Sequence, residues 1–269
     1  MKTETSPGNG TDGGKKVVLI TGGGSGIGAA SARQIAADCA HVGILDQNEN
    51  SASAVLASII GNRGTGEVIV ADVTDHIQMQ QSIQDFANRR GRLDGVVISA
   101  GINGVWAPID DLLPDEFDHT IAINLRGTYL TLHFAVPYLK VAGGSVVIIS
   151  SVNGVRTFSS AGASAYAASK AAQLAIGNQL SLELARYKIR VNTVCPGHTN
   201  TGIGQTSRTR NQAESEYPAN YALGKIPLTG GIPAEACDVA EAVAFLMSDR
   251  ARHISGSSLF VDGAGSILT

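Results

Sequence analysis

The sequence predicts an α/β protein with a doubly wound, seven-stranded parallel sheet and helices on both faces. Short apolar runs alternate with longer amphipathic segments along the chain, and such alternation is typical of βαβ units that build a parallel sheet. The apolar runs are nearly continuous, as expected for strands that helices cover on both sides. A glycine-rich turn follows the first run directly, which favours a tight connection from strand to helix.

The expected strands are short and rich in β-branched residues, and the first begins at Val17. Amphipathic segments between them predict helices, among them residues 75–90, 124–140, 165–187 and 233–248. Pro233 and Glu235 suit the start of the last of these helices, because proline lacks an N–H group that the first turn would leave unpaired. We place the seven strands at residues 17–21, 41–45, 67–71, 93–98, 145–149, 189–194 and 258–261.

The chain is expected to form one domain over residues 15–269, preceded by a flexible tail at residues 1–14 that has no function of its own. One long stretch, residues 198–225, shows little apolar periodicity and many Thr, Gly, Asn and Ser residues. A long connection inside a compact domain is usually a functional lid or disordered. We therefore expect this lid segment to close over a substrate.

Composition excludes several classes of protein. The net charge of -3 and the lack of a long run of Lys and Arg argue against a nucleic-acid partner. No apolar run approaches the roughly 18 residues of a membrane span, so no membrane partner is expected. Cys39, Cys195 and Cys237 lie far apart and the six histidines are scattered. This spacing predicts no disulfide framework and no metal site, and it favours the reducing cytoplasm.

The glycine-rich turn reads Thr21-Gly-Gly-Gly-Ser-Gly-Ile-Gly28 and opens an alanine-rich helix. A helix N-terminus offers free N–H groups and a partial positive charge, and glycines let a pyrophosphate approach the backbone. The alternative is a plain surface turn. A Walker-type loop is excluded because Ala29 and Ala30 stand where Lys and Ser or Thr are required. The expected cofactor contacts in this turn are Gly22, Gly24, Ser25, Gly26, Ile27 and Gly28.

Asp46 follows the second expected strand, and no basic residue accompanies it, since Gln47 and Asn48 come next. A carboxylate at this position accepts hydrogen bonds from the ribose hydroxyls of an adenosine and repels a 2′-phosphate. The sequence therefore predicts NAD as the cofactor in preference to NADP. The alternative is a solvated aspartate at a strand end.

Several motifs in order resemble the short-chain dehydrogenase/reductase family over residues 16–265. The turn has the spacing T-G-x-x-x-G-x-G, Tyr166-Ala-Ala-Ser-Lys170 has the spacing Y-x-x-x-K, and Asp262-Gly263 matches the closing D-G pair. Ser99 stands where the family usually has Asn, and the gap between Ser151 and Tyr166 is slightly longer than usual, with the additional residues at 156–162. The resemblance implies a Rossmann-type fold and further cofactor contacts at Asp72, Val73, Ala100, Gly101, Tyr166, Lys170, Pro196, Gly197, Thr199 and Thr201.

By the same resemblance, Asn124, Ser151, Tyr166 and Lys170 are the catalytic residues, and Asn124 holds a water that links Lys170 to solvent. Tyr166 and Lys170 are four residues apart and share one helix face. A free phenol has a pKa of about 10, and a nearby ammonium lowers it, as would the positive nicotinamide ring. Tyr166 is then expected to act as the acid/base, with Ser151 orienting the substrate oxygen. Taken without the other motifs, the pair would be an ordinary amphipathic helix face.

The resemblance implies an oxidoreductase that transfers a hydride between NAD(H) and a secondary alcohol or ketone. The alternative is a non-catalytic NAD-sensing or scaffold protein on the same fold. A serine hydrolase is excluded because no G-x-S-x-G turn occurs. A sugar, a steroid, a small cyclic ketone and a 3-oxoacyl thioester all remain open as substrates. Expected substrate contacts are Trp106, Asn153, Phe158 and His198, each of which could instead only pack in a loop; Arg156 is expected to be solvated.

The helix at residues 165–187 carries a series of small side chains, which allow close approach of another helix. Family members usually associate through this helix and its neighbour at residues 124–140. The resemblance therefore implies a homotetramer, and the alternative is that both helices pack only within one subunit.

Overall fold

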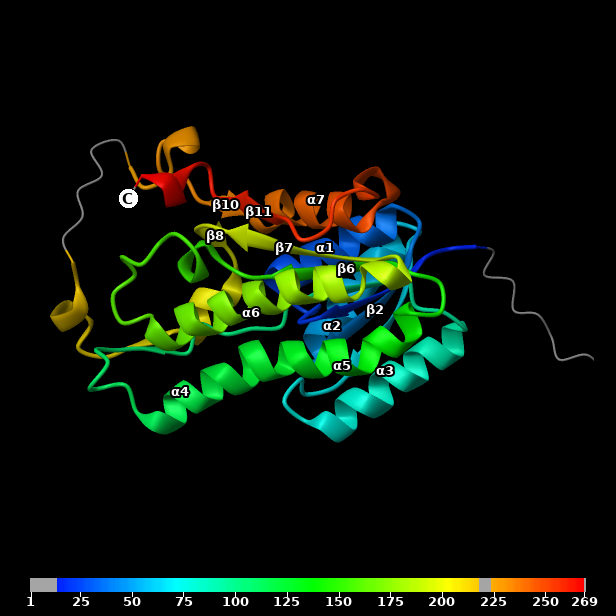
Figure 1. Ribbon diagram of the computed structural model, residues 1–269, viewed down its shortest axis with the longest axis horizontal. Coiled ribbons are helices and arrows are strands. Elements are labelled where there is room, and N and C mark those ends of the chain that lie inside the picture. Colours follow the sequence, from blue (N-terminus) through cyan, green and yellow to red (C-terminus); the bar gives the residue numbers. More distant parts are fainter. Residues whose placement is uncertain (1–13, 218–223, 269) are drawn as a thin grey trace, which may run out of the picture.

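The computed structural model describes residues 14–217 and 224–268 of the chain. Its centre is a parallel sheet of seven strands in the order β11-β7-β6-β4-β1-β2-β3, which confirms the predicted sheet (Figure 1). The chain steps from β1 outward to β2 and β3, and then returns to the other side of β1 through β4. The strands are β1 (Val17–Thr21), β2 (His41–Asp46), β3 (Thr65–Val70), β4 (Gly95–Ile98), β6 (Gly144–Ile149), β7 (Ile189–Pro196) and β11 (Ser258–Val261).

Helices cover both faces of this sheet, as predicted. On one face lie α1 (Gly26–Ala37), α2 (Glu49–Gly61) and α7 (Ala236–Met247). On the other lie α3 (His76–Arg90), α5 (Gly127–Leu139) and α6 (Ser164–Glu183), which are on the near side in Figure 1. Successive side chains of a strand point to opposite faces, so each apolar strand contributes to two cores.

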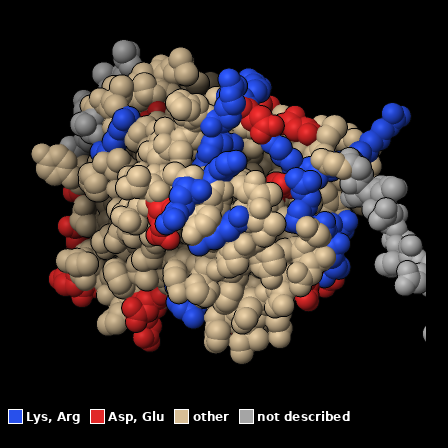
Figure 2. All heavy atoms as spheres, turned by 45° about the vertical axis from the view of Figure 1, so that its right-hand side comes forward, with Lys and Arg blue, Asp and Glu red and all other residues tan. Residues whose placement is uncertain are grey.

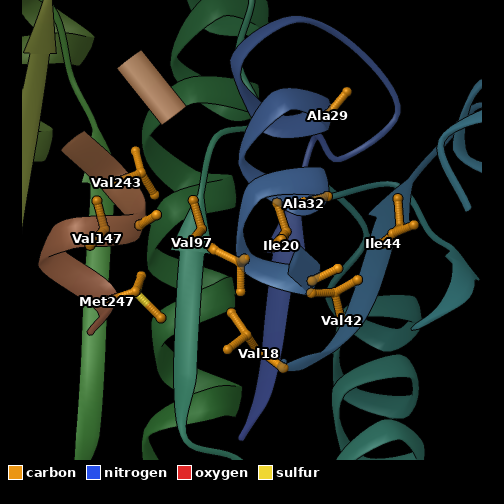
Figure 3. Close-up of a cluster of buried hydrophobic side chains, with 14 of the residues drawn as sticks. Val18, Ile20, Ala29, Ala32, Val42, Ile44, Val97, Val147, Val243 and Met247 are labelled. Atoms are coloured by element: carbon orange, nitrogen blue, oxygen red, sulfur yellow. The ribbon is translucent and has the colours of Figure 1, made fainter. Parts of the chain in front are cut away.

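Figure 3 shows the core beneath α1 and α7. Val18 and Ile20 of β1 pack there, whereas Val17 and Leu19 of the same strand belong to the core on the other face. The packing is close: a Cβ atom on Gly95 would lie 2.1 Å from Cε of Met247. Burying an aliphatic side chain stabilises a fold by about 1.5–3 kcal/mol. The two cores therefore hold the strands firmly, and with them the loops at their carboxyl ends.

The helix boundaries differ from the sequence predictions at three places. The helix expected at residues 165–187 ends at Glu183, and a 3-10 turn, η3 (Ala185–Tyr187), follows it. The helix expected from residue 233 begins at Ala236, because Glu235 is its N-cap and Ala234–Glu235 (β10) pairs with Thr199–Asn200 (β8). The helix expected at residues 124–140 starts with a π-helical turn, η1 (Ala122–Arg126), which follows α4 (Pro114–Ile121) and leads into α5.

The lid segment lies against the rest of the protein where the structure describes it. Within this segment, β9 (Arg208–Thr209) pairs with β5 (Val105–Trp106) in a short two-stranded sheet. Like the pairing of β8 with β10, this sheet was not predicted from the sequence. Next to it, Arg210 contacts both carboxylate oxygens of Glu116, at 2.9 and 2.8 Å. Arg210 lowers the pKa of Glu116 to about 2, so this ion pair persists until strongly acidic pH. Residues 218–223 of the segment and residues 1–13 of the predicted tail lie outside the described residues.

The end of the molecule at which the parallel strands begin is rich in basic side chains, as Figure 2 shows. Many are held by carboxylates: Arg89 and Arg90 both contact Glu67, and Arg92 contacts Asp94 at 2.6 Å. Within the described ranges, no group of His, Cys, Asp or Glu side chains is placed to hold a metal ion. Among those same residues, no helix has the length and apolar character that crossing a membrane requires.

Candidate active site

A cavity of about 1620 Å³ opens at the carboxyl ends of the strands. The residues that follow β1, β2, β4, β6 and β7 all line it, together with the start of α6 and part of the lid segment. This is the edge of an open α/β sheet at which ligands bind, next to the point where the strand order reverses between β1 and β4. The volume exceeds the roughly 300–1,000 Å³ of most small-molecule sites, so the cavity has room for a dinucleotide and a second molecule.

The glycine turn brings the N-terminus of α1 to the cavity. Gly22 has a φ of +64°, and a Cβ atom there would lie 2.7 Å from Cα of Ala100, so no other residue fits this crossing of two loops. Ser25 is the N-cap of α1 but makes no side-chain capping bond among the described residues. Ser25, Gly26 and Ile27 line the cavity. The first N–H groups of the helix are thus available to an anion.

Two glycines of the turn that the sequence singled out as cofactor contacts, Gly24 and Gly28, do not line the cavity. A Cβ atom on Gly28 would lie 2.1 Å from the carbonyl oxygen of Gly22, and one on Gly24 would lie 2.8 Å from Oδ2 of Asp46. The structure therefore gives both positions a packing reason for glycine. The other members of the turn that the sequence singled out are in place.

Asp46 lies at the end of β2 and lines the cavity. Its Oδ2 accepts a hydrogen bond from the N–H of Gly24 at 2.9 Å, and its Oδ1 accepts one from the N–H of Asn48 at 2.9 Å. The carboxylate is therefore fixed beside the glycine turn. Further along the same wall, Oδ1 of Asp72 accepts hydrogen bonds from the N–H and the hydroxyl of Thr74, both at 2.8 Å. The remaining predicted cofactor contacts also line the cavity: Val73, Ala100, Gly101, Tyr166, Lys170, Pro196, Gly197, Thr199 and Thr201.

Ser151, Tyr166 and Lys170 meet in the wall of the cavity. Ser151 follows β6 and is hydrogen-bonded to the Tyr166 hydroxyl, while the other two side chains come from the first turns of α6. A Cβ atom on Gly154 would lie 2.5 Å from the backbone nitrogen of Ala171. Because glycine lacks that atom, the loop after β6 can lie directly on α6, and this contact brings the serine to the tyrosine.

Lys170 is buried and Tyr166 is half-buried, and loss of solvent opposes charge on each side chain. Burial raises the pKa of Tyr166, although the hydrogen bond from Ser151 acts in the opposite direction. Burial lowers the pKa of Lys170 to about 8, and its nitrogen lies 5.7 Å from the centre of the Tyr166 ring. In the polypeptide without a cofactor, desolvation therefore outweighs the other effects on Tyr166. A lowered tyrosine pKa beside Lys170 and a bound nicotinamide ring stays a prediction.

Asn124 lies in the π-helical turn η1 and is fully buried rather than exposed to the cavity. Its side chain accepts a hydrogen bond from the N–H of Ile102 at 2.8 Å and donates to the Ile102 carbonyl and to Oγ of Ser169. The side chain thus fixes the loop after β4 against α6. The backbone carbonyl of Asn124 has a different partner from the side chain. It accepts a hydrogen bond from Nε2 of Gln173 at 2.8 Å.

Sequence reasoning did not single out Gln173, which lies one turn after Lys170 on α6. Its Oε1 accepts a hydrogen bond from the Lys170 ammonium at 3.0 Å, and the amide is completely buried. The available signal was the spacing of three residues, since helical residues at i and i+3 lie side by side. A polar residue three positions after a buried lysine is therefore a candidate hydrogen-bond partner for that lysine.

Three of the four predicted substrate contacts line the cavity. Trp106 lies with its ring 6.2 Å from that of Tyr166, and Asn153 donates a hydrogen bond to Oγ of Ser160 at 2.8 Å. His198 is exposed at the base of the lid segment. Phe158 does not line the cavity and its side chain is 73% exposed, so nothing in the structure supports the predicted contact. Arg156 is exposed, as expected, and its guanidinium also lies 3.5 Å from the centre of the Phe260 ring.

Comparison with known proteins supports one assignment. The sequence profile of the family described as Enoyl-(Acyl carrier protein) reductase matches residues 22–265. Levodione reductase of Leifsonia aquatica is 34% identical over 255 residues, which cover 93% of this chain and 94% of that protein. A crystal structure of a 3-ketoacyl-ACP reductase from Sinorhizobium meliloti 1021 superimposes with a TM-score of 0.90 at 50% identity, covering 94% of this chain and 100% of that chain. The chain belongs to the short-chain dehydrogenase/reductase family.

Members of this family bind a nicotinamide dinucleotide, and a 3-ketoacyl-(acyl-carrier-protein) reductase from Brucella melitensis has been solved in complex with NADH. That structure has a TM-score of 0.81 at 29% identity and covers 93% of this chain and 98% of its own. As a member of the family, this short-chain dehydrogenase/reductase is an oxidoreductase that transfers hydride between such a dinucleotide and a secondary alcohol or ketone. The comparisons give no support to the alternative of a non-catalytic sensor or scaffold.

The residues of the cavity fit a nicotinamide dinucleotide. The N-terminus of α1 suits a pyrophosphate, and Asp46 lies where a carboxylate can accept bonds from ribose hydroxyls. Lys170 makes two hydrogen bonds among the described residues, to the Ile149 carbonyl at 2.9 Å and to Gln173. Since an ammonium donates three, one N–H is left for a ligand in the cavity.

Proposed function

We propose that this chain is an NAD-dependent dehydrogenase or reductase of secondary alcohols and ketones, with Tyr166 as its acid/base. The observation that carries the proposal is the meeting of Ser151, Tyr166 and Lys170 in the wall of a cavity that the α1 N-terminus and Asp46 also line. A bound nicotinamide ring supplies the hydride acceptor or donor. The alcohol or carbonyl carbon that exchanges the hydride then lies beside the tyrosine hydroxyl.

The polypeptide supplies the proton transfer and the orientation. In alcohol oxidation, the Tyr166 oxygen takes the hydroxyl proton of the substrate; in ketone reduction, the same oxygen returns it. Ser151, which is hydrogen-bonded to Tyr166, holds the substrate oxygen at that position. Lys170 favours the phenolate by its charge and offers its remaining N–H to the nicotinamide ribose.

Turnover on a panel of secondary alcohols and ketones tests the proposal, with NADH formation or loss followed by absorbance. Turnover with NAD(H) supports it. Tight binding of NAD with no turnover on any member of the panel would favour the sensor or scaffold. The panel should include cyclic ketones, polyols and 3-oxoacyl thioesters, because polar and apolar groups are mixed in the wall around Trp106.

Cofactor preference follows from Asp46. We expect kcat/KM to be higher with NAD than with NADP, because the fixed carboxylate repels a 2′-phosphate. Asp46→Asn removes the negative charge but keeps one side-chain oxygen that can accept a backbone N–H bond. The variant should lower the NAD-to-NADP ratio of kcat/KM by about tenfold, the equivalent of about 1.4 kcal/mol. The matched control Asp72→Asn, on the same wall, should leave the ratio unchanged. Equal use of both cofactors by the parent protein would contradict the assignment.

We also propose that the lid segment closes over the substrate. Its described part contributes Thr201, Ile203 and Arg208 to the cavity wall, and a closing loop excludes water from a reaction. Hydrogen exchange with and without NAD and a substrate tests this, and unchanged protection of the segment would count against a lid.

A homotetramer is expected in solution. On α6, Leu182 is 80% exposed and Ala168 and Ala175 are also exposed, while Tyr129 is 52% exposed on α5. These apolar groups next to small side chains suit a second copy of the two helices. Light scattering at micromolar protein should give the mass of four chains, and a monomer alone would refute the assembly.

The cytoplasmic location stays a prediction, with which the free thiols of Cys39, Cys195 and Cys237 agree.

A further inference from the structure

We propose that Gln173 is a positioning residue that holds the Lys170 ammonium in place for Tyr166, and this inference rests on the proposed acid/base role of Tyr166. By the family resemblance, Asn124 holds a water that links Lys170 to solvent. In this chain the side-chain amide of Gln173 links Lys170 directly to the Asn124 carbonyl. Its Oε1 accepts from Lys170 Nζ at 3.0 Å, and its Nε2 donates to the Asn124 carbonyl at 2.8 Å.

The orientation of the amide is fixed by its partners. Nε2 also donates to Oγ1 of Thr128 at 2.8 Å, and that hydroxyl donates in turn to the Asn124 carbonyl at 2.7 Å. A flipped amide would place its NH₂ group against the ammonium and its oxygen against the Asn124 carbonyl, which pairs donor with donor and acceptor with acceptor. Because the whole group is buried, such a mismatch is costly. The hydrogen-bond partners therefore orient Oε1 toward Lys170.

The backbone geometry supplies the acceptor that sets this orientation. Asn124 lies in the π-helical turn η1, where the N–H of Gly127 bonds to the carbonyl of Ala122. Such turns depart from the regular helical hydrogen bonds and occur often at functional sites. Here the turn presents the Asn124 carbonyl to two side chains, those of Gln173 and Thr128.

The physical effect of Gln173 is on the charge of Lys170. Burial lowers the pKa of that lysine to about 8, and an acceptor held against its nitrogen favours the ammonium form. Tyr166 faces Lys170 from the same helix and Cys195 faces it from β7. The pKa of Cys195 is raised to about 11, so the thiol is neutral near pH 7. Without Gln173 the ammonium is less stable and less fixed, and the phenolate of Tyr166 is stabilised less.

The test measures Tyr166 directly. Phenolate formation in the NAD-saturated protein is followed by near-ultraviolet difference absorbance, and subtraction of the same titration for Tyr166→Phe isolates this residue. Gln173→Leu should raise the titration midpoint of Tyr166 by about one pH unit. For alcohol oxidation, kcat at pH 7 should fall about tenfold and return toward the parent value above the shifted midpoint. A merely structural role would not produce that recovery.

The matched control is Asn192→Leu, which removes another buried amide, one that donates to the Ile254 carbonyl and accepts from the Ser257 N–H. It should lower thermal stability without moving the midpoint. Gln173→Glu is the second variant if Gln173→Leu does not fold, and it should also raise the midpoint because its carboxylate offsets the ammonium. An unshifted midpoint in the variant that folds, or a loss of kcat equal at every pH, overturns the inference. Failure of the parent to turn over any substrate would instead overturn the proposed function, since the titration does not depend on turnover.

Discussion

Tyr166→Phe should lower kcat by about 10²–10⁴, the usual contribution of a general acid or base, and leave NADH affinity nearly unchanged. The substitution removes only the hydroxyl oxygen, which is the atom proposed to exchange the proton. The ring remains, and with it the contact to Trp106 at 6.2 Å between ring centres. Folding should therefore survive, since among the described residues the hydroxyl loses one hydrogen bond, that to Ser151.

The measurement is steady-state kinetics with the best substrate of the panel, together with NADH binding by fluorescence. Tyr129→Phe is the matched control, because that tyrosine lies on the outer side of α5 and is 52% exposed. It should retain parental kcat. A folded Tyr166→Phe variant with turnover close to that of the parent would remove the basis of the mechanism.

The pH dependence has opposite signs for the two directions of reaction. Oxidation needs the phenolate, so its rate rises with pH through the pKa of Tyr166; reduction needs the phenol, so its rate falls through the same pKa. Burial places that pKa above its usual value in the polypeptide. The positive charges of Lys170 and of the oxidised nicotinamide lower the pKa of Tyr166. We therefore expect the rate of alcohol oxidation to rise with a midpoint pH below the pKa of free tyrosine. Tyr166→Phe should abolish the rise.

The fold could be predicted because each strand and helix carries its own signal. A run such as Val17–Thr21 is apolar up to its last residue and buried along its whole length, so it requires cover on both faces. Boundaries were less predictable where tertiary contacts decide them. Pro233 suggested a helix start, but pairing of β10 with β8 holds that stretch extended and moves the start to Ala236.

The site was predictable to the extent that its residues occur in ordered motifs. Tyr166 and Lys170 have a fixed spacing on one helix, and Asp46 ends a strand. Phe158 could not be placed, because it lies in a loop whose course no local pattern determines, and its ring is exposed. Gln173 was missed for a different reason: its role depends on the Asn124 carbonyl, which a π-helical turn presents from a distant part of the chain.

Lys170→Met is expected to lower both kcat and NADH affinity, since the ammonium has two proposed tasks. Loss of its charge removes the stabilisation of the Tyr166 phenolate. Loss of its free N–H removes a charged hydrogen bond to the ribose, worth about 1.5–3 kcal/mol, which corresponds to a roughly ten- to hundredfold weaker Kd. The side chain of methionine keeps the apolar stem. Lys140→Met, at the exposed end of α5, is the matched control and should change neither quantity.

The pH dependence of this difference separates a charged lysine from a merely space-filling one. The pKa of Lys170 is about 8, so below that pH the parent has the ammonium and the full advantage in NADH affinity over Lys170→Met. As pH rises through about 8 the ammonium loses its proton, and the ratio of the two Kd values should shrink. Circular dichroism must first show that the variant folds, because Gln173 and the Ile149 carbonyl lose a donor. If a folded Lys170→Met bound NADH as tightly as the parent at pH 6, the ribose contact would be ruled out. A ratio above one that did not change with pH would rule out the ammonium as its source.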